Sequence, residues 1–163
     1  MKGRLTYVTR SVTTLIVWLI FIAHFGQSHA QMGASLTVEQ VEEALVKTRN
    51  LKPMIDLSIR FEFDSATLLD QSKPNLRVIA DAFNGKKLGA YSFQVEGHTD
   101  KQGMAQYNQR LSERRADAVV TFLVNVGVQR ERLTAVGKGF HELADETNPT
   151  AAENRRVRIR TQP

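Results

Sequence analysis

Apolar and polar residues alternate in two stretches of this 163-residue chain. The first is IDLSIRFEF, at 55–63, and the second is AYSFQVEG, at 90–97. A period of two puts every second side chain on the same face, so each stretch predicts a strand with one face in a core. Shorter runs of the same kind predict a third strand at 132–137 and a fourth at 156–161.

Three other segments carry apolar residues at helical spacing. The first follows Leu36, where Thr37 and Gln40 fit a capping box and predict a short helix over 38–47. The second follows a loop, with Asp70 or Ser72 as its expected N-cap and Gly85 as its end. The third and longest is expected over 104–126, with Gly127 as the stop signal.

The order of these elements predicts an α+β fold. We expect a two-layer sandwich of the order β-α-β-α-β-β, with a mixed four-stranded sheet and the helices on one face. The expected domain spans 55–163, preceded by an N-terminal helix and linker at 31–54. A long polar connection, 140–153, separates the last two strands.

The first thirty residues have the pattern of a secretory signal peptide. Lys2, Arg4 and Arg10 precede an uncharged apolar run at 11–26, and Ser28-His29-Ala30 offers a cleavage site after Ala30. A transmembrane helix needs about 20 apolar residues, which is more than this run contains. We therefore predict a cleaved signal at 1–30 and export; the alternative is an uncleaved anchor in the inner membrane.

Composition narrows the possible functions. The formal charge is +5, but three of the 22 basic residues and none of the 17 acidic ones lie in 1–30, so the remainder carries only +2. This small excess argues against nucleic-acid binding. Cysteine is absent, which excludes disulfides, thiolate metal sites and a lipidated N-terminal cysteine.

The stretch HTDKQGMAQYNQRLSERRA, at 98–116, gathers polar groups at the start of the longest helix. Free backbone N–H groups there favour an anion, and Asp100 favours a cation. Asn108 and Arg115 are seven positions apart and share a helix face. This set suits a small zwitterion, but Asp100 as an ordinary cap and Arg115 paired with a neighbouring acid remain open alternatives.

Four spaced motifs give the chain a resemblance to the OmpA-like domain family. They are FEFDSATL at 61–68, the GHTDxxGxxxYNxxLSxxRAxxVxxxL pattern from Gly97 to Leu123, GVxxxRLxAVGxG at 127–139 and NRRVxI at 154–159. The resemblance extends from about Ile55 to Arg160. It implies non-covalent binding of peptidoglycan through the diaminopimelate of stem peptides, and location in the periplasm or at the outer membrane.

The resemblance also implies which residues bind. Asp100 and Arg115 would hold the charged ends of diaminopimelate, and the supporting contacts would come from Thr99, Asn108, Leu111 and Arg155. Two positions depart from the family pattern: Phe140 replaces a common acid, and Arg158 lies where an acid often follows RRV. Outer-membrane or other envelope proteins are the expected protein partners; the sequence leaves the oligomeric state open.

Other functions find less support. His98, Asp100 and His141 could be imagined as metal ligands, but a lone histidine is more often a hydrogen-bonded structural residue than a ligand. No paired nucleophile and base indicates an enzyme, and neither a cofactor nor a metal is expected. A non-wall alternative is a protein-interaction module, with the helix at 38–47 as its docking element.

Overall fold

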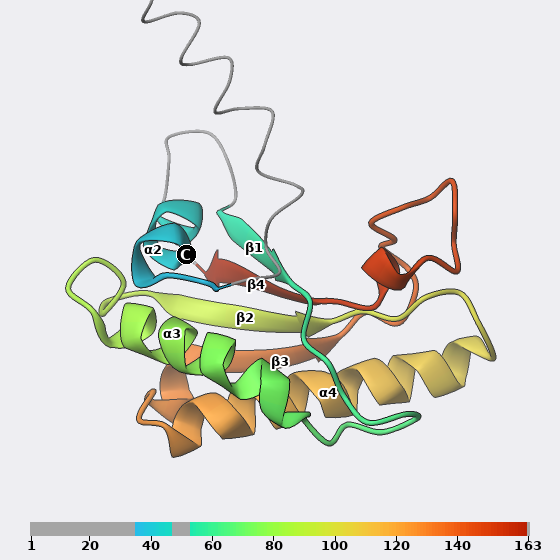
Figure 1. The fold of residues 1–163 in the computed structure, drawn as a ribbon, viewed down its shortest axis with the longest axis horizontal. Helices are drawn as coiled ribbons and strands as arrows, with labels where there is room; N and C mark the ends of the chain where they lie inside the picture. The colour runs from blue at the N-terminus through green and yellow to red at the C-terminus, as the bar shows by residue number, and fades with distance from the viewer. Residues whose placement is uncertain (1–34, 47–52, 163) are drawn as a thin grey trace, which may run out of the picture. The chain divides into compact units, whose positions relative to one another are not determined.

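The computed structural model describes residues 35–46 and 53–162, so the predicted signal peptide lies outside the described residues. Residues from Leu36 onward form one compact unit, shown in Figure 1. Its main elements are α2 (Val38–Leu45), β1 (Met54–Leu57), α3 (Lys73–Asn84), β2 (Ser92–Gly97), α4 (Ala105–Asn125), β3 (Leu133–Gly137) and β4 (Val157–Gln162). Short 3₁₀ turns span Asp70–Ser72, Arg130–Arg132 and Ala152–Asn154.

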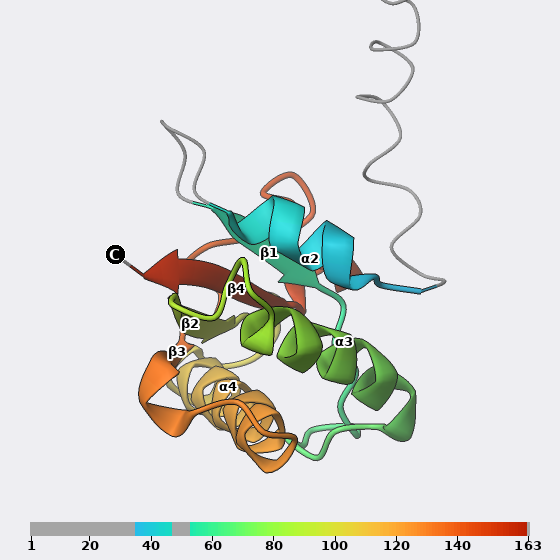
Figure 2. The same cartoon turned by 90° about the vertical axis from the view of Figure 1, so that its left-hand side faces the viewer.

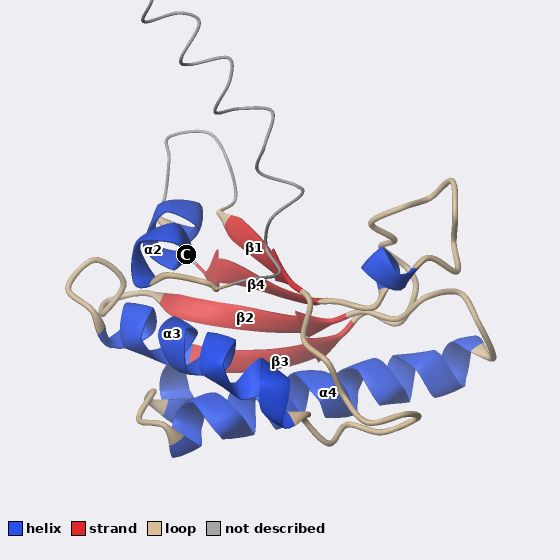
Figure 3. Cartoon of the chain, viewed as in Figure 1, coloured by secondary structure: helices blue, strands red, loops and turns tan. Residues whose placement is uncertain are grey.

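The four strands form a mixed sheet in the order β1-β4-β2-β3. β2 pairs with β3 in parallel, and β4 pairs antiparallel with both β1 and β2. This confirms the predicted α+β class and the order of strands and helices. Because β1, β2 and β3 run in one direction, their carboxyl ends meet the start of β4 at one end of the sheet (Figure 3).

The core lies between one face of the sheet and the helices. Figure 2 shows α3 and α4 side by side along the sheet. Phe83 of α3 stacks on Phe93 of β2 with ring centroids 3.6 Å apart, and both side chains are fully buried. Ile159 of β4 and Leu123 of α4 are also inaccessible to solvent. Burial of such side chains stabilises each one by about 2 kcal/mol relative to exposure.

Helix α2 begins with the predicted capping box, since Thr37 and Gln40 bond each other's backbone N–H groups. Val41 and Leu45 are fully buried in the same core as the sheet. The apolar face of α2 therefore covers the core of its own domain, which does not favour its use as a docking element. The helix ends at Leu45, and residues 47–52 lie outside the described segments.

The first predicted strand was too long. β1 pairs with β4 only as far as Leu57, which lies opposite Val157, the first residue of β4. Beyond that point no strand offers a partner, and the chain leaves the sheet. Ile59 is still buried and Phe61 still packs on the core, so the alternation continues through a segment that is not a strand.

Ser72 is the N-cap of α3, which confirms one of the two predicted candidates, but its side chain makes no capping bond to the helix. Ser72 Oγ instead accepts a hydrogen bond from the N–H of Arg60 at 2.8 Å. α4 does end as predicted: Gly127 adopts a φ of +103° just after the helix. Within the described ranges, no helix could span a bilayer, and the 21-residue α4 carries charges along its length.

α4 lies directly against the ends of two strands. A Cβ atom on Gly97 would collide with the main chain of Ser112, and one on Gly137 would collide with Glu113. The fully buried Ser112 accepts a hydrogen bond from the N–H of Gly139 at 2.9 Å. These contacts fix α4 relative to the residues that follow β2 and β3.

Candidate ligand-binding site

The candidate site begins where β2 ends. The N–H of His98 donates to the carbonyl of Arg156 at 2.9 Å, and the N–H of Thr99 donates to that of Gly139 at 2.8 Å. The N–H of Lys101 donates to the carbonyl of Pro149 at 2.9 Å. Residues 98–101 are therefore held on both sides by the segments that precede β4 and follow β3.

Asp100 is almost fully buried, with 7% of its surface exposed. Its Oδ1 accepts a hydrogen bond from the N–H of Gln102 at 3.0 Å, and its Oδ2 accepts one from Nη1 of Arg155 at 2.7 Å. The N-cap of α4 is Met104, so Asp100 is not the helix cap considered from the sequence. It is already paired with the guanidinium of Arg155.

Arg115 is half-buried and pairs with neither acid on its own helix. Its Nε donates to the carbonyl of Ser65 at 3.0 Å, and its guanidinium lies 4.9 Å from the ring centroid of Phe61. Burial lowers the pKa of Arg115 from its usual value. Among the described residues, no hydrogen bond occupies either of its terminal nitrogens.

The segment after β1 adds a carboxylate that the sequence analysis missed, and it is bonded to a tyrosine of α4. Asp64, which has a φ of +50°, accepts a hydrogen bond from the hydroxyl of Tyr107 in the first turn of α4. This bond raises the pKa of Tyr107. The FEFDSATL motif contains Asp64, but its spacing alone does not show that this loop reaches α4. The site thus contains two carboxylates, Asp64 and Asp100, and two guanidinium groups, Arg115 and Arg155.

The other three predicted contacts are buried beneath these groups. Thr99, Asn108 and Leu111 are between 3% and 6% exposed. Asn108 Nδ2 donates to the carbonyl of Gln102 at 2.6 Å and so ties the loop before α4 to the helix. Leu111 is buried apart from the main core cluster. Asn108 therefore holds the loop next to Asp100 in place, whereas for Leu111 the structure shows burial alone.

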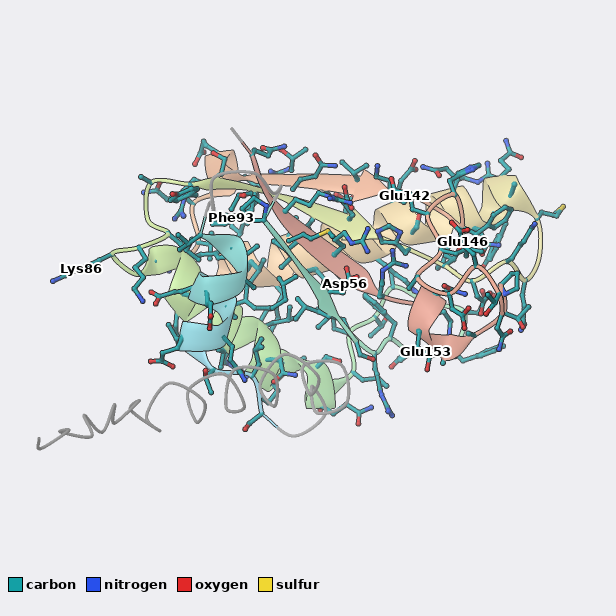
Figure 4. The ribbon with its side chains drawn as sticks, turned by 90° about the horizontal axis from the view of Figure 1, so that it is seen from above. Asp56, Lys86, Phe93, Glu142, Glu146 and Glu153 are labelled. Carbon is teal, nitrogen blue, oxygen red and sulfur yellow. The ribbon has the colours of Figure 1, made fainter. Side chains whose placement is uncertain are left out.

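Asn154 organises the long connection between β3 and β4, and the sequence analysis missed it too. It is fully buried; its Oδ1 accepts from the N–H groups of Ala144 and Asp145, and its Nδ2 donates to the carbonyls of Asp145 and Asn148. It immediately precedes Arg155. Figure 4 shows Glu142, Glu146 and Glu153 of this connection at the end of the domain opposite Lys86.

A second polar cluster lies on the sheet beside the candidate site. Glu96, His98 and Glu142 offer ligand atoms within 4.8 Å of one another, which differs from the trio imagined from the sequence. Arg160 Nε already contacts both carboxylate oxygens of Glu96 at 3.1 Å, and Lys138 Nζ lies 2.9 Å from Glu142 Oε1. These cations neutralise the carboxylates, so the cluster fits an ion-pair network better than a metal site.

Burial alone would raise the pKa of Glu96, but its contacts with His98 and Arg160 outweigh this effect and lower the pKa to about 2. With this pKa, Glu96 is ionised at neutral pH, although only 2% of its surface is exposed. Both ring nitrogens of His98 are buried without a hydrogen-bond partner among the described residues. Nε2 of His98 lies 3.5 Å from Oε2 of Glu96.

The sequence of this chain is similar to parts of several known envelope proteins. The chain is 44% identical over 108 residues to outer membrane porin F of Pseudomonas aeruginosa, a match covering 63% of this chain and 30% of the porin. It is 34% identical over 99 residues to the peptidoglycan-associated lipoprotein of Legionella pneumophila, covering 60% of this chain and 55% of the lipoprotein. The chain thus spans about a third of the porin and about half of the lipoprotein.

Solved structures share the fold. The crystal structure of the peptidoglycan-associated lipoprotein from Burkholderia pseudomallei matches with a TM-score of 0.54 and 30% identity, over 64% of this chain and 88% of that one. At the level of sequence families, residues 60–158 match the OmpA family. This match contains every predicted site residue, the strands β2 and β3 and the start of β4, and the chain belongs to the OmpA family.

Proposed function

We propose that this domain binds peptidoglycan non-covalently through the diaminopimelate residue of its stem peptides. Membership of the OmpA family supports a role in the cell envelope in association with peptidoglycan, and two of the relatives are named peptidoglycan-associated lipoproteins. The finer assignment to diaminopimelate depends on the chemistry of the candidate site.

The side chain of diaminopimelate ends in an ammonium and a carboxylate on one carbon. Asp100 would accept hydrogen bonds from the ammonium, and Arg115 would donate two parallel bonds to the carboxylate. The observation that carries this proposal is the state of Arg115: Nε and the ring of Phe61 hold its guanidinium in place, while both terminal nitrogens lack a partner among the described residues.

The ammonium would share Asp100 with Arg155. A carboxylate has room for several donors, so Oδ2 can keep its bond to Arg155 while the ligand approaches the remaining lone pairs. Asp64 adds a second negative charge near Arg115. The two carboxylates and two guanidinium groups balance, as recognition of a zwitterion requires.

The role is one of binding. One amino-acid head held by a few charged groups gives modest affinity, and repeated stem peptides on a polymer add avidity if the protein is tethered or oligomeric.

The position in the envelope depends on the N-terminal segment. Cleavage after Ala30 would release the domain into the periplasm, whereas an uncleaved segment would anchor it to the inner membrane. N-terminal sequencing of the protein recovered from envelope fractions distinguishes the two forms: Gln31 as first residue supports cleavage, and Met1 supports the anchor.

The binding test is co-sedimentation of residues 31–163, which contain the whole compact unit, with purified sacculi. The parent should pellet, and Asp100→Ala and Arg115→Ala should remain in solution while circular dichroism shows that they are folded. Arg114→Ala is the matched control because Arg114 is the exposed neighbour of Arg115. Sacculi with lysine in place of diaminopimelate should not pellet the parent.

Two outcomes would contradict the proposal. Equal sedimentation with lysine-type sacculi would show that diaminopimelate is not what the domain recognises. Failure of the folded parent to pellet with either kind of sacculus would favour the alternative of an OmpA-like protein-interaction module.

A further inference from the structure

Two large apolar side chains stand in solvent. Phe63 is 100% exposed and Met104 is 76% exposed. Among the described residues, one other large apolar side chain is classed with them as exposed, Met54 of β1, at 45%. Phe63 and Met104 contribute nothing to the core, so folding does not account for an aromatic ring and a thioether at these two positions.

Phe63 and Met104 come from different parts of the chain, but both border the candidate site. Phe63 lies at the tip of a turn in which the N–H of Ser65 donates to the carbonyl of Glu62 at 3.2 Å. The next residue, Asp64, is bonded to Tyr107, and Ser65 is bonded to Arg115. The turn that presents Phe63 is therefore fastened to α4 at two points of the site.

Met104 belongs to the helical partner in the Asp64–Tyr107 hydrogen bond. It is the N-cap of α4, and its carbonyl accepts a hydrogen bond from the N–H of Asn108 at 3.0 Å. Tyr107 follows it by three positions, which is one helical turn. The bond between Tyr107 and Asp64 therefore joins the segment that contains Phe63 to the helix turn that begins at Met104, beside the charged groups of the candidate site.

Apolar surface beside a few convergent charged groups is the usual composition of a small-ligand site. Single exposed apolar residues are common, but two of them at the edge of a polar pocket fit a ligand that has an apolar part next to its charged part. The flexible thioether of methionine and the flat ring of phenylalanine can both cover small groups such as methyls.

We propose that Phe63 and Met104 form an apolar lip that binds the alanyl methyl groups of the stem peptide next to the residue whose charged head enters the pocket. This inference rests on the proposed function. Alanine supplies the only apolar side chains of such a peptide, and the first alanine after diaminopimelate is bonded to it directly. With this lip, the domain would recognise a segment of the stem peptide and not diaminopimelate alone.

The test compares two soluble pentapeptides by isothermal titration calorimetry. One is L-Ala-γ-D-Glu-meso-diaminopimelate-D-Ala-D-Ala; the other has Gly-Gly in place of D-Ala-D-Ala, so only two methyl groups differ. The protein should bind the alanyl peptide about tenfold more tightly, since each buried methyl group contributes a several-fold factor. The Phe63→Ser, Met104→Ser double variant should bind both peptides with the affinity that the parent has for the glycyl peptide.

Met54→Ser is the matched control, because it also removes an exposed apolar side chain but lies on β1 in pairing with β4. It should keep the tenfold preference. Equal binding of the two peptides by the parent, or a preference that survives in the double variant, would overturn the lip and leave the proposed function intact. If the folded parent binds neither peptide, the proposed function fails and the lip fails with it.

Discussion

Arg155 and Asp100 lie 55 positions apart in the chain, yet Nη1 of the arginine donates to Oδ2 of the aspartate at 2.7 Å. The bond links the residue that precedes β4 by two positions to the loop that follows β2. It orients a carboxylate that is mostly hidden from solvent, while the arginine side chain remains 47% exposed. Arg155 thus fixes the orientation of the Asp100 carboxylate and balances its negative charge.

Replacing Arg155 with Gln tests whether this residue helps to bind the ligand. The variant should bind muropeptides about tenfold more weakly in calorimetric titrations, because Asp100 loses the charge-assisted hydrogen bond that orients it for the ligand ammonium. Its free energy of unfolding should change by less than about 1 kcal/mol, since an ion pair with so exposed an arginine stabilises little.

The control is Arg114→Gln, which removes an exposed guanidinium from α4 without touching the site. Tighter binding by Arg155→Gln would contradict the prediction. It would show that Arg155 competes with the ligand ammonium for Asp100 and is not a binding residue.

Asn154→Ala should loosen the connection between β3 and β4. Four hydrogen bonds end on this fully buried amide, so its removal leaves backbone groups of residues 144–148 without partners. We expect a loss of about 2 kcal/mol in the free energy of unfolding and faster amide exchange in this segment. Hydrogen-exchange mass spectrometry measures both, with the exposed Thr150→Ala as control; unchanged protection of 144–148 would contradict this role.

The pH dependence of stability should report Glu96. Its pKa is about 2 in the folded protein and near 4.5 when unfolded, so the stability from its ionised form is present above pH 4.5 and is lost as pH falls toward 2. The shift corresponds to about 3 kcal/mol. Urea unfolding of the parent and of Glu96→Gln should therefore differ most at pH 6 and converge between pH 4.5 and pH 2.

Other acids, including Asp56, also lose ion pairs in acid, so the parent's curve alone does not isolate Glu96. The difference between the two proteins does. A gap that stays constant from pH 6 to pH 2 would mean that Glu96 is not stabilised as an anion by Arg160 and His98.

Local patterns sufficed to predict most of the fold. The capping box at Thr37 and the stop at Gly127 are interactions over a few residues, and both were confirmed. The first strand failed because its end depends on where β4 begins, about 100 positions later. Ile59 and Phe61 keep a strand-like alternation after the strand has ended, so the pattern reports which side faces the core and not whether a partner is present.

The same limit applies to the candidate site. Asp100 and Arg115 could be singled out because they lie at one end of a single predicted helix. The pairing of Asp100 with Arg155 and that of Asp64 with Tyr107 join residues 55 and 43 positions apart, and no local spacing announces them. Asn154 could be found from its motif, but its function in holding a loop is visible only once that loop folds around it.

Gly97 connects the packing of the fold to the site, and its replacement by Ala is the sharpest test of that connection. The new Cβ would meet the main-chain oxygen, carbon and Cα of Ser112, which belong to the rigid middle of α4 and cannot move aside as a flexible side chain could.

For Gly97→Ala we expect a loss of about 3 kcal/mol in the free energy of unfolding, measured by urea titration. Gly127→Ala is the comparison: its Cβ would make only an ordinary contact with Asn84 Nδ2, at 3.9 Å, and a positive φ opposes it, so about 1 kcal/mol should be lost. Because Gly97 lies three residues before Asp100, the strain should also displace that carboxylate, and sedimentation with sacculi should weaken in Gly97→Ala but not in Gly127→Ala. A Gly97→Ala protein as stable as the Gly127→Ala protein would show that α4 does not pack against the end of β2 as closely as described.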